Sequence, residues 1–405
     1  MILIYKAING LVLMNTKIIY IITDSPIPMG MAEASRIFSY AKGFLYHKLP
    51  CEIVVFRKTE SRQNIINFNV EGESEGVKFR YLFKSTIKAK YFFKRRLDAF
   101  IGIVKLFLFS ALYVKPESVI IYYSSYTMPV VALRLAKVFN KVILLKEEGE
   151  HPSVRKRNHN LFSRLIIDHI HYRLFNGFLL ITQNLMQYFD KKYPGKAKIH
   201  VTLTVDQERF LNLNTEKKNF ITYLGQLNDK KDGVGILIKA FAKVVQKFPG
   251  YYLNLIGEAE SKELRDKYEK DVLNYGIEEN VVFRGSIDRN TVPNVLMEST
   301  VLVLPRPDSI QARNGFPTKL GEYLATGNPV VVTSVGEIPN YLIDKKSAFL
   351  AIPGSVENLA EKICEVLNNL EFAKKVGLNG QKVAAKHFNK NDETKKIIEF
   401  IRENF

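Results

Sequence analysis

The segment 313–333, RNGFPTKLGEYLATGNPVVVT, holds the residues best suited to bind a phosphorylated ligand. Its pattern predicts a Gly-Phe-Pro turn, a helix over about 317–325 and then a buried strand. Proline fits a first helical turn because no N–H group is required there. The next backbone N–H groups are expected to face outward at the positive end of the helix dipole, which attracts phosphate. They belong to Thr318, Lys319 and Leu320.

Glu322 lies about one turn further along the same predicted helix. A carboxylate accepts two hydrogen bonds, which suits the diol of a ribose better than a phosphate. The alternative is an ordinary amphipathic helix with a solvated glutamate, because spacing alone is weak evidence for a site.

The elements that must position these residues follow from the hydrophobic pattern. Short apolar runs rich in β-branched residues alternate with longer amphipathic stretches, which is typical of parallel α/β layering. The sequence therefore predicts an α/β protein with two doubly wound, Rossmann-like domains facing across a cleft, with ligands beyond the carboxyl ends of the strands. The expected strands are 17–23, 52–56, 77–83, 118–123, 141–146, 177–182, 198–203, 219–224, 251–256, 281–284, 300–304, 329–333 and 348–352.

The motifs of the second half resemble glycosyltransferase family 4, the retaining, nucleotide-sugar-dependent enzymes of the GT-B fold. The segment NGFPTKLGE at 314–322 matches the family's glutamate motif in length and in its second Glu, and ATGNPVV follows it. A second match is YLGQL at 223–227, followed by KKDGV and LIKAF. The resemblance covers about 205–385 and implies the GT-B fold for the whole chain.

The resemblance also implies a donor site. Lys231 falls on the Lys that the family offers to the donor diphosphate, and Gly30 matches a glycine that lets the backbone approach donor phosphate and sugar. A lone glycine is equally a turn residue. The turn and the start of the helix complete the expected donor-binding set, which is Gly315, Phe316, Pro317, Thr318, Lys319, Leu320 and Glu322.

Two departures from the family pattern affect this site. Asn314 stands where the family has its first Glu, and Gln226 stands where it has a diphosphate-binding Arg. Asparagine can hydrogen-bond a sugar hydroxyl, but it cannot take a proton or carry charge. The missing Arg removes a bidentate phosphate clamp, which Arg313 or Arg306 could partly replace. A degenerate, inactive member of the family is the alternative.

His151 and Asn314 are the expected catalytic residues. His151 follows a predicted strand, as the family's functional His does, although a lone histidine is more often structural. Glu148 and Glu150 compete with it for an acceptor-binding role. The sequence has no Asp-x-Asp motif for a divalent ion, and the mid-helix pair His169-x-His171 does not converge on a metal. We therefore expect no metal site and no cofactor, with the nucleotide-sugar as co-substrate.

The positive charge of the chain is concentrated in its first half. The 405 residues carry a net charge of +18, and residues 1–200 hold 31 Lys and Arg against 14 Asp and Glu. The stretch 84–96, KSTIKAKYFFKRR, fits an anionic membrane surface, nucleic acid or a solvated face. The amphipathic stretch 97–114 behind it favours a membrane and makes nucleic acid the weaker alternative. The predicted membrane-facing residues are Lys84, Lys88, Lys90, Lys94, Arg95 and Arg96.

These observations give the expected domain organisation. Residues 1–13 are interpreted as a start-site extension or a weak surface anchor, and 14–205 as the N-terminal domain that faces acceptor and membrane. Residues 206–385 form the donor domain, and 386–405 a C-terminal helix that crosses back to the N-terminal domain. Stretch 97–114 is too short and too charged to span a membrane, and two cysteines exclude a disulfide scaffold.

The sequence thus predicts a cytoplasmic glycosyltransferase of the hexosyltransferase type, peripheral at the inner face of the membrane. It would move a sugar with retention from a nucleotide-diphosphate donor to a lipid-linked or saccharide acceptor in surface polysaccharide biosynthesis. A GT-B-fold nucleotide-sugar 2-epimerase and a non-catalytic, basic nucleic-acid-binding protein are the alternatives.

Overall fold

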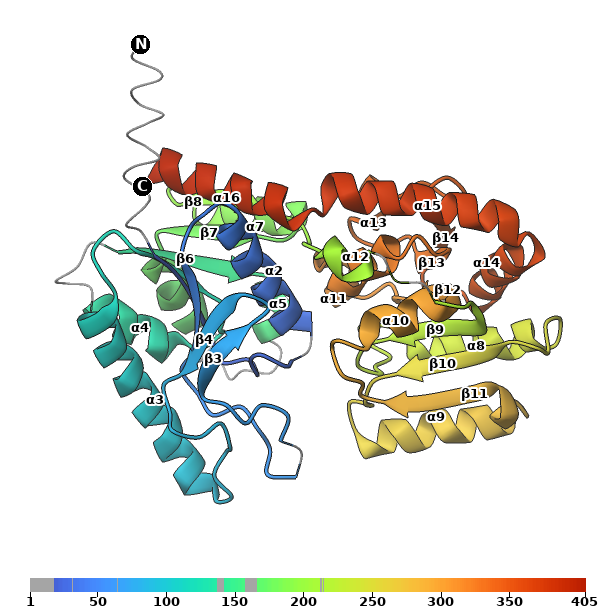
Figure 1. The fold of residues 1–405 in the computed structure, drawn as a ribbon, viewed down its shortest axis with the longest axis horizontal. Coiled ribbons are helices and arrows are strands. Elements are labelled where there is room, and N and C mark those ends of the chain that lie inside the picture. The colour runs from blue at the N-terminus through green and yellow to red at the C-terminus, as the bar shows by residue number, and fades with distance from the viewer. Residues whose placement is uncertain are drawn as a thin grey trace, which may run out of the picture. The chain divides into compact units, whose positions relative to one another are not determined.

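The chain folds into two compact units. The computed structural model describes residues 18–30, 32–63, 65–136, 142–156, 166–211, 213 and 215–405. One unit comprises Met1–Val201 together with Lys390–Phe405, and the other comprises Thr202–Asn389. Each is built on a sheet of mainly parallel strands with helices packed on it (Figure 1). The doubly wound α/β fold expected from the hydrophobic pattern is therefore confirmed.

The first unit has an eight-stranded sheet in the order β3-β4-β2-β1-β5-β6-β7-β8. All its strand pairs are parallel except β3 with β4. β1 and β5 are buried along their whole length, which explains their continuous apolar sequences. The strands are β1 (Ile19–Thr23), β2 (Cys51–Val55), β3 (Glu71–Ser74), β4 (Val77–Tyr81), β5 (Val119–Tyr122), β6 (Ile143–Glu148), β7 (Gly177–Leu180) and β8 (Ala197–His200).

The helices of the first unit lie against this sheet and at its carboxyl edge. They are α2 (Ala32–Tyr46), α3 (Phe92–Tyr113), α4 (Thr127–Ala136), α5 (Pro152–Lys156), the π-helical segment η1 (Ile167–His171), the 3-10 turn η2 (Tyr172–Leu174), α7 (Gln183–Lys192) and α16 (Lys390–Asn404). No helix among the described residues is long and apolar enough to cross a membrane.

The second unit has a six-stranded parallel sheet in the order β11-β10-β9-β12-β13-β14. Its strands are β9 (Lys218–Leu224), β10 (Tyr252–Ile256), β11 (Val281–Gly285), β12 (Ser299–Leu304), β13 (Val330–Thr333) and β14 (Phe349–Ala351). Its helices are η3 (Gln207–Phe210), α8 (Val234–Val245), α9 (Lys262–Asn274), η4 (Glu278–Asn280), α10 (Val292–Glu298), α11 (Ile310–Asn314), α12 (Thr318–Ala325), α13 (Ile338–Tyr341), α14 (Val356–Asn368) and α15 (Leu370–His387).

Every strand expected from the sequence is present in the structure, with ends shifted by one or two residues in most cases. β3 was not expected. Its four residues, Glu-Gly-Glu-Ser, carry no apolar side chain, and it lies exposed at the antiparallel edge of the first sheet. Its pairing is therefore set by its neighbour β4 and not by a hydrophobic pattern of its own.

The C-terminal helix α16 is part of the core of the first unit. Its residues Ile397, Ile398 and Ile401 belong to the same buried cluster as β1 and α2, and α16 packs along α2 (Figure 1). The two helices approach closely at Gly43, because a Cβ there would lie 2.3 Å from Oγ1 of Thr394. The chain thus returns from the second unit at Lys390 to complete the first.

The close approach at Gly43 generates a stability prediction. Alanine has a helix propensity about 1 kcal/mol better than that of glycine, so Gly43→Ala should stabilise an isolated helix. In this protein the new methyl group would overlap the Thr394 side chain and the carbonyl oxygen of Lys390. We therefore expect Gly43→Ala to lower the free energy of unfolding by about 1–3 kcal/mol, measured by urea denaturation.

The matched control is Gly195→Ala, in the same unit, because a Cβ at Gly195 would meet nothing within 4 Å. It should leave the unfolding transition in place. Stabilisation of the protein by Gly43→Ala would contradict the packing of α16 on α2.

Candidate functional site

The candidate donor site lies where the second sheet changes direction. From β9 the chain builds β10 and β11 on one side, and then β12, β13 and β14 on the other. Because β9 and β12 are parallel neighbours, the loops that follow them leave the sheet at the same carboxyl edge. Ligands of doubly wound sheets bind at such a switch point.

Helix α12 begins beside this edge. The hydroxyl of Tyr323 accepts the backbone N–H of Leu224 at 2.7 Å, which ties α12 to the end of β9. On another side of the helix, Gly321 packs so closely that a Cβ would lie 2.5 Å from Leu203. Gly327, with φ of +72°, follows the end of the helix in the left-handed conformation that glycine favours. The predicted turn, helix and strand are therefore confirmed.

The expectation that three N–H groups are free at the start of α12 is wrong for one of them. Pro317 is the N-cap of the helix, and its carbonyl oxygen accepts the N–H of Leu320 at 3.0 Å. This bond closes a tight first turn and uses the Leu320 donor. The N–H groups of Thr318 and Lys319 remain the candidates of this turn for binding phosphate.

Arg306 joins the two loops of the switch point from the inside. Its guanidinium is buried, with 1% of the residue exposed. It donates to the carbonyl oxygens of Lys231, at 3.4 Å, and Gly315, at 3.1 Å. The sequence suggested Arg306 as a substitute phosphate clamp, but its donors serve backbone carbonyls instead. Arg313, the other suggested substitute, is exposed and pairs with Asp308.

A second cation of the site, the largely buried Lys319, was expected to act through its backbone N–H group and not through its side chain. Nζ of Lys319 lies 2.8 Å from Oδ2 of Asp232 and 2.9 Å from the hydroxyl of Tyr223. Burial would raise the pKa of Asp232, but the ammonium of Lys319 outweighs it and holds this pKa below its usual range. The Asp232 carboxylate is therefore ionised and Lys319 neutralises it.

The Lys319 ammonium also occupies the space beside the β9 loop. A Cβ on Gly225 would lie 2.2 Å from this nitrogen, so only glycine fits here, with its φ of +145°. Gln226, which follows Gly225, is exposed, and so is Lys231 at the end of the same loop. The loop therefore presents Lys231 to solvent and keeps Lys319 beneath it.

Glu322 already has a partner in the structure. Its Oε1 accepts from Nη1 of Arg209 at 2.9 Å, and both side chains are largely buried. Arg209 is itself anchored, because its Nη2 donates to the carbonyl oxygen of Arg289 at 2.6 Å. The alternative of a freely solvated glutamate is therefore wrong: a fixed guanidinium holds this carboxylate.

The turn before α12 is held by packing. The ring of Phe316 is buried and contacts the rings of Tyr341 and Phe388 at centroid distances of 5.4 and 5.6 Å. The side-chain amide of Asn314 donates to the carbonyl oxygen of Ile310, at 2.8 Å. Asn314 thus ends α11 next to Gly315, at the edge where the donor site is expected.

The candidates of the first unit lie at the carboxyl edge of its own sheet. Gly30 precedes α2 in a tight turn, because a Cβ there would lie 2.5 Å from the carbonyl oxygen of Pro26. His151 follows β6, as expected, and directly precedes α5. Its Nδ1 accepts the N–H of Ser153 at 3.2 Å, and its ring lies 4.6 Å from that of Tyr188.

Buried ion pairs support the end of β6. Glu147 accepts from Nε of Arg36 at 2.8 Å inside the first unit. Glu148 accepts from the hydroxyl of Tyr172 at 2.8 Å and is 1% exposed. Since Glu148 offers no oxygen at the surface, the suggestion that it competes for an acceptor is wrong.

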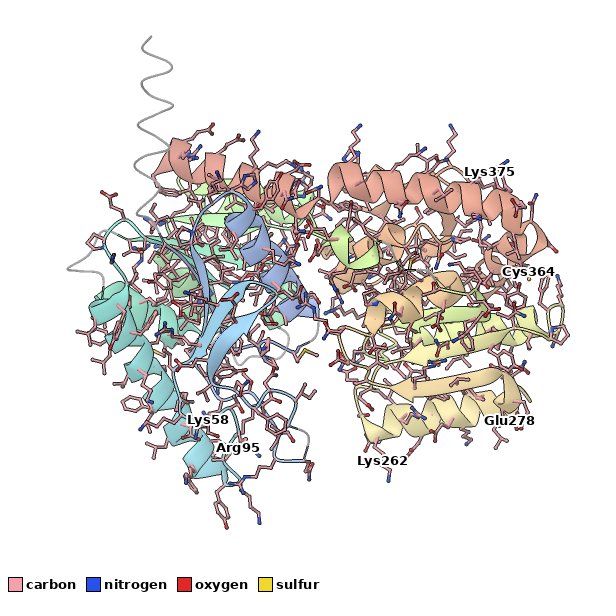
Figure 2. All side chains as sticks on the ribbon, in the orientation of Figure 1. Lys58, Arg95, Lys262, Glu278, Cys364 and Lys375 are labelled. Atoms are coloured by element: carbon pink, nitrogen blue, oxygen red, sulfur yellow. The ribbon has the colours of Figure 1, made fainter. Side chains whose placement is uncertain are left out.

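The described residues contain no group of three or more His, Cys, Asp or Glu side chains arranged to hold a metal ion. His171 has its Nδ1 at 3.3 Å from the hydroxyl oxygen of Thr127, and its ring packs on Phe175. Cys51 and Cys364 are free and buried; Cys364 is marked in Figure 2.

The six predicted membrane-facing cations, Lys84, Lys88, Lys90, Lys94, Arg95 and Arg96, are all exposed. Three of them precede α3 and three lie in its first turns. Figure 2 labels Arg95 near one end of α3. Nε of Arg95 donates to the carbonyl oxygen of Ala89 at 2.7 Å, which fixes the loop to the helix.

Known structures share this architecture. The chain is similar to sucrose-phosphate synthase from Thermosynechococcus elongatus, with a TM-score of 0.73 and 16% identity over 96% of this chain and 98% of that one. It is also similar to HepE from Anabaena in complex with UDP and glucose, with a TM-score of 0.71 and 16% identity over 96% of this chain and 100% of that one. At such identity the likeness establishes the fold, which is GT-B.

The family model matches a segment within the second unit, and the sequence relatives match less than half of the chain. Residues 204–383 match the family model described as "Glycosyl transferases group 1". An uncharacterized glycosyltransferase of Methanocaldococcus jannaschii is 29% identical over 171 residues, which are 42% of this chain and 44% of the relative. Phosphatidyl-myo-inositol mannosyltransferase of Mycobacterium leprae is 23% identical over 149 residues, 37% of each chain. The chain thus spans less than half the length of these two relatives.

The fold is GT-B, and the family match is limited to the second unit. Residues 204–383, which contain the β9 loop, Arg306 and α12, match the model of group 1 glycosyl transferases.

The buried pair of Lys319 and Asp232 generates a stability prediction. In Lys319→Met the Asp232 carboxylate stays buried without its cation, so the free energy of unfolding should fall by about 3–5 kcal/mol. Lys231→Met, one residue before Asp232 but exposed, should change it by less than about 0.5 kcal/mol. The double variant Lys319→Met/Asp232→Asn should recover part of the loss. Urea denaturation measures all three, and equal stability of the two single variants would contradict the pair.

Proposed function

We propose that the chain is a retaining glycosyltransferase of family 4 that transfers a hexose from a nucleotide-diphosphate donor. The observation that carries this proposal is the meeting of the Lys231 loop, the start of α12 and Glu322 at the switch point of the second sheet. This arrangement offers donors for phosphate and, one helical turn away, an acceptor for a diol. A nucleoside diphosphate carries both groups, a diphosphate and a ribose diol, about one helical turn apart.

The donor groups divide into two sets in this proposal. The ammonium of Lys231 and the N–H groups of Thr318 and Lys319 bind the diphosphate, with the helix dipole adding to the attraction. The free oxygen of Glu322 accepts the ribose hydroxyls. These groups neutralise the leaving diphosphate without a metal ion or a cofactor.

In this proposal the side-chain amide of Asn314 orients the sugar. His151 and Gly30 lie at the carboxyl edge of the first sheet, and their roles toward the sugar stay predictions from the sequence. Because Asn314 is neutral, no carboxylate at that position stabilises the developing sugar cation. We therefore assign the base in retention to the donor phosphate itself, with attack on the face that the leaving group departs from.

The acceptor is a lipid-linked or saccharide molecule used in surface polysaccharide biosynthesis, and the protein works as a peripheral protein at the cytoplasmic face of the membrane. Two facts support this. One relative is named a phosphatidyl-myo-inositol mannosyltransferase, and the six exposed cations around the start of α3 favour an anionic surface over nucleic acid.

The donor site predicts which variants lose nucleotide binding. Lys231→Ala and Glu322→Ala should each weaken UDP or GDP binding about tenfold, since each removes a hydrogen bond to a charged group or ribose. The measurement is a titration followed by thermal shift or calorimetry. Lys230→Ala is the control, because Lys230 is the exposed neighbour of Lys231. Unchanged affinity in both variants would reject the site.

The ion pair of Arg209 and Glu322 makes Arg209 a positioning residue. In Arg209→Met the Glu322 carboxylate loses its anchor, so the affinity for UDP or GDP should fall about fivefold. Inorganic pyrophosphate has no ribose, and its binding should not change. A parallel loss for pyrophosphate would show that Arg209 acts on the phosphates or on folding instead.

A further inference from the structure

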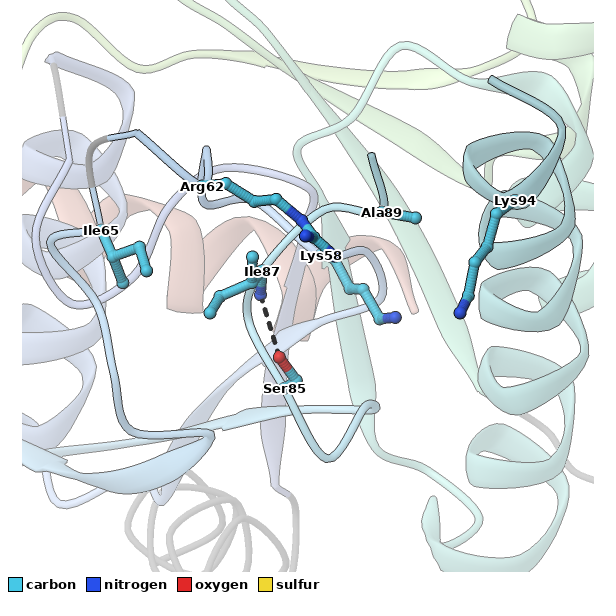
Figure 3. A pocket seen from close by; sticks show the side chains of 7 residues that line it. All are labelled: Lys58, Arg62, Ile65, Ser85, Ile87, Ala89 and Lys94. Atoms are coloured by element: carbon cyan, nitrogen blue, oxygen red, sulfur yellow. Dashed lines mark hydrogen bonds between the residues drawn. The ribbon is translucent and has the colours of Figure 1, made fainter. Parts of the chain in front are cut away.

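A hollow lined by three cations lies in the first unit, and none of the residues proposed above for the donor lines it. Its volume is about 430 Å³, within the usual range for small-molecule sites. Lys58, Arg62 and Lys94 line it together with Ser85, Ile65 and Ile87 (Figure 3). We call it the basic hollow.

Backbone pairing holds the walls of the basic hollow in place. Lys58 follows β2, and Ser85 and Ile87 follow β4, which is a parallel neighbour of β2. The two loops then pair again, because the N–H groups of Thr59 and Glu60 both donate to the carbonyl oxygen of Thr86 at 2.9 Å. The hollow is therefore built from two loops fixed at the carboxyl edge of the sheet.

The charge inside the basic hollow is positive. No carboxylate is among the residues that line it. Lys58 pairs with Asp98 at 3.1 Å, but within the described part of the chain no carboxylate pairs with Arg62 or Lys94. The nearby Glu60 is buried, and its oxygens accept from Asn67 and from the N–H of Ile66.

The remaining groups suit a phosphate attached to an apolar body. The hydroxyl oxygen of Ser85 accepts the N–H of Ile87 at 3.2 Å (Figure 3), so its own proton can be donated to an anion. Ile65 and Ile87 contribute apolar surface beside the cations. A fully hydrated polyanion gains no binding free energy from such apolar surface. The glycerol or alkyl part of a lipid gains binding free energy when it is buried against it.

Helix α3 adds an apolar surface that starts at the rim of the basic hollow. Lys94 lines the hollow, and the preceding residue, Phe93, is 85% exposed. From there exposed apolar side chains recur every three or four residues, so they share one face of the helix. They are Phe93, Leu97, Phe100, Val104, Leu108 and Leu112, and we call them the α3 stripe.

The opposite face of α3 is packed on the unit. Leu106 and Phe109 are buried, and a Cβ on Gly102 would lie 2.4 Å from the carbonyl oxygen of Phe56. The helix is about 33 Å long at 1.5 Å per residue, and it cannot leave the sheet to cross a bilayer. Its exposed stripe and its cationic start fit a helix that lies in the membrane interface.

We propose that the basic hollow binds the phosphate of an anionic lipid while the α3 stripe contacts the bilayer that contains it. This inference rests on the proposed membrane role and adds to it a defined binding site and its ligand chemistry. Charge complementarity selects the occupant: Asp98 neutralises Lys58, but no carboxylate of the described residues pairs with Arg62 or Lys94, and these two cations select an anion. The mainly aliphatic stripe selects a lipid surface over a nucleic acid, which has no apolar face of that kind.

The test is flotation of the full chain with two kinds of vesicle of equal negative charge. In one the charge comes from phosphatidic acid, and in the other from oleate, which has a carboxylate and no phosphate. We expect the wild-type protein to prefer phosphatidic acid. Arg62→Ala/Lys94→Ala should lower the partition coefficient for these vesicles about 10- to 30-fold and remove the preference, since each basic residue near the surface contributes about fivefold.

The charge-matched control is Lys78→Ala/Lys191→Ala, which removes two exposed lysines of the same unit outside the hollow and should lower binding less than about threefold. Leu97→Ser/Leu112→Ser should weaken binding to both kinds of vesicle. UDP titration of the same variants tests the donor site independently of lipid binding. A preference for phosphatidic acid without UDP binding would reject the proposed function and leave this inference standing.

Two results would overturn the inference. The first is equal binding of the wild-type protein to both kinds of vesicle, or an equal fall in the partition coefficient for the two double variants that remove charge. Either would show a nonspecific electrostatic attraction and no phosphate site. The second is binding to duplex DNA that is tighter than to phosphatidic acid vesicles and lost in Arg62→Ala/Lys94→Ala, which would make nucleic acid the partner.

Discussion

The buried guanidinium of Arg306 is the constraint on which the candidate donor site depends. It lies under two loops. It donates to the carbonyl oxygen of Lys231, 75 residues away in sequence, and to that of Gly315, nine residues away. A buried guanidinium must satisfy its donors within the protein. The loop after β9 and the turn before α12 therefore have to stay where their carbonyl groups reach it.

The largely buried side chain of Lys319 joins the same two elements. It extends from α12 and neutralises Asp232 on the β9 loop. The helix and the loop are therefore connected by this ion pair as well as by Arg306. The arrangement leaves Lys231 exposed on the outside. The second unit thus brings a few fixed groups to a small area, although its net charge is close to zero.

The first unit uses charge in another way. Its buried pairs of Arg36 with Glu147 and of Lys146 with Glu148 support the end of β6, while many of its other cations are at the surface. Those around the start of α3 combine with an exposed apolar stripe and a hollow lined by cations. Part of the excess of basic residues in the first half of the sequence therefore lies at one surface, formed by the basic hollow and the α3 stripe. There the positive charge is adjacent to exposed apolar side chains.

The sequence by itself determined the strand segments, the helix at 318–325 and the group of residues around it, because continuous apolar runs and a Gly-Phe-Pro turn are local signals. Only the tertiary structure decided which side chains face each other. Strand β3 has no apolar pattern, the Leu320 donor is used within its own turn, and Arg306, Lys319 and Arg209 have partners distant in sequence. Their roles depend on burial and on the order of strands in the sheet. The spacing of residues along the chain predicts neither of these.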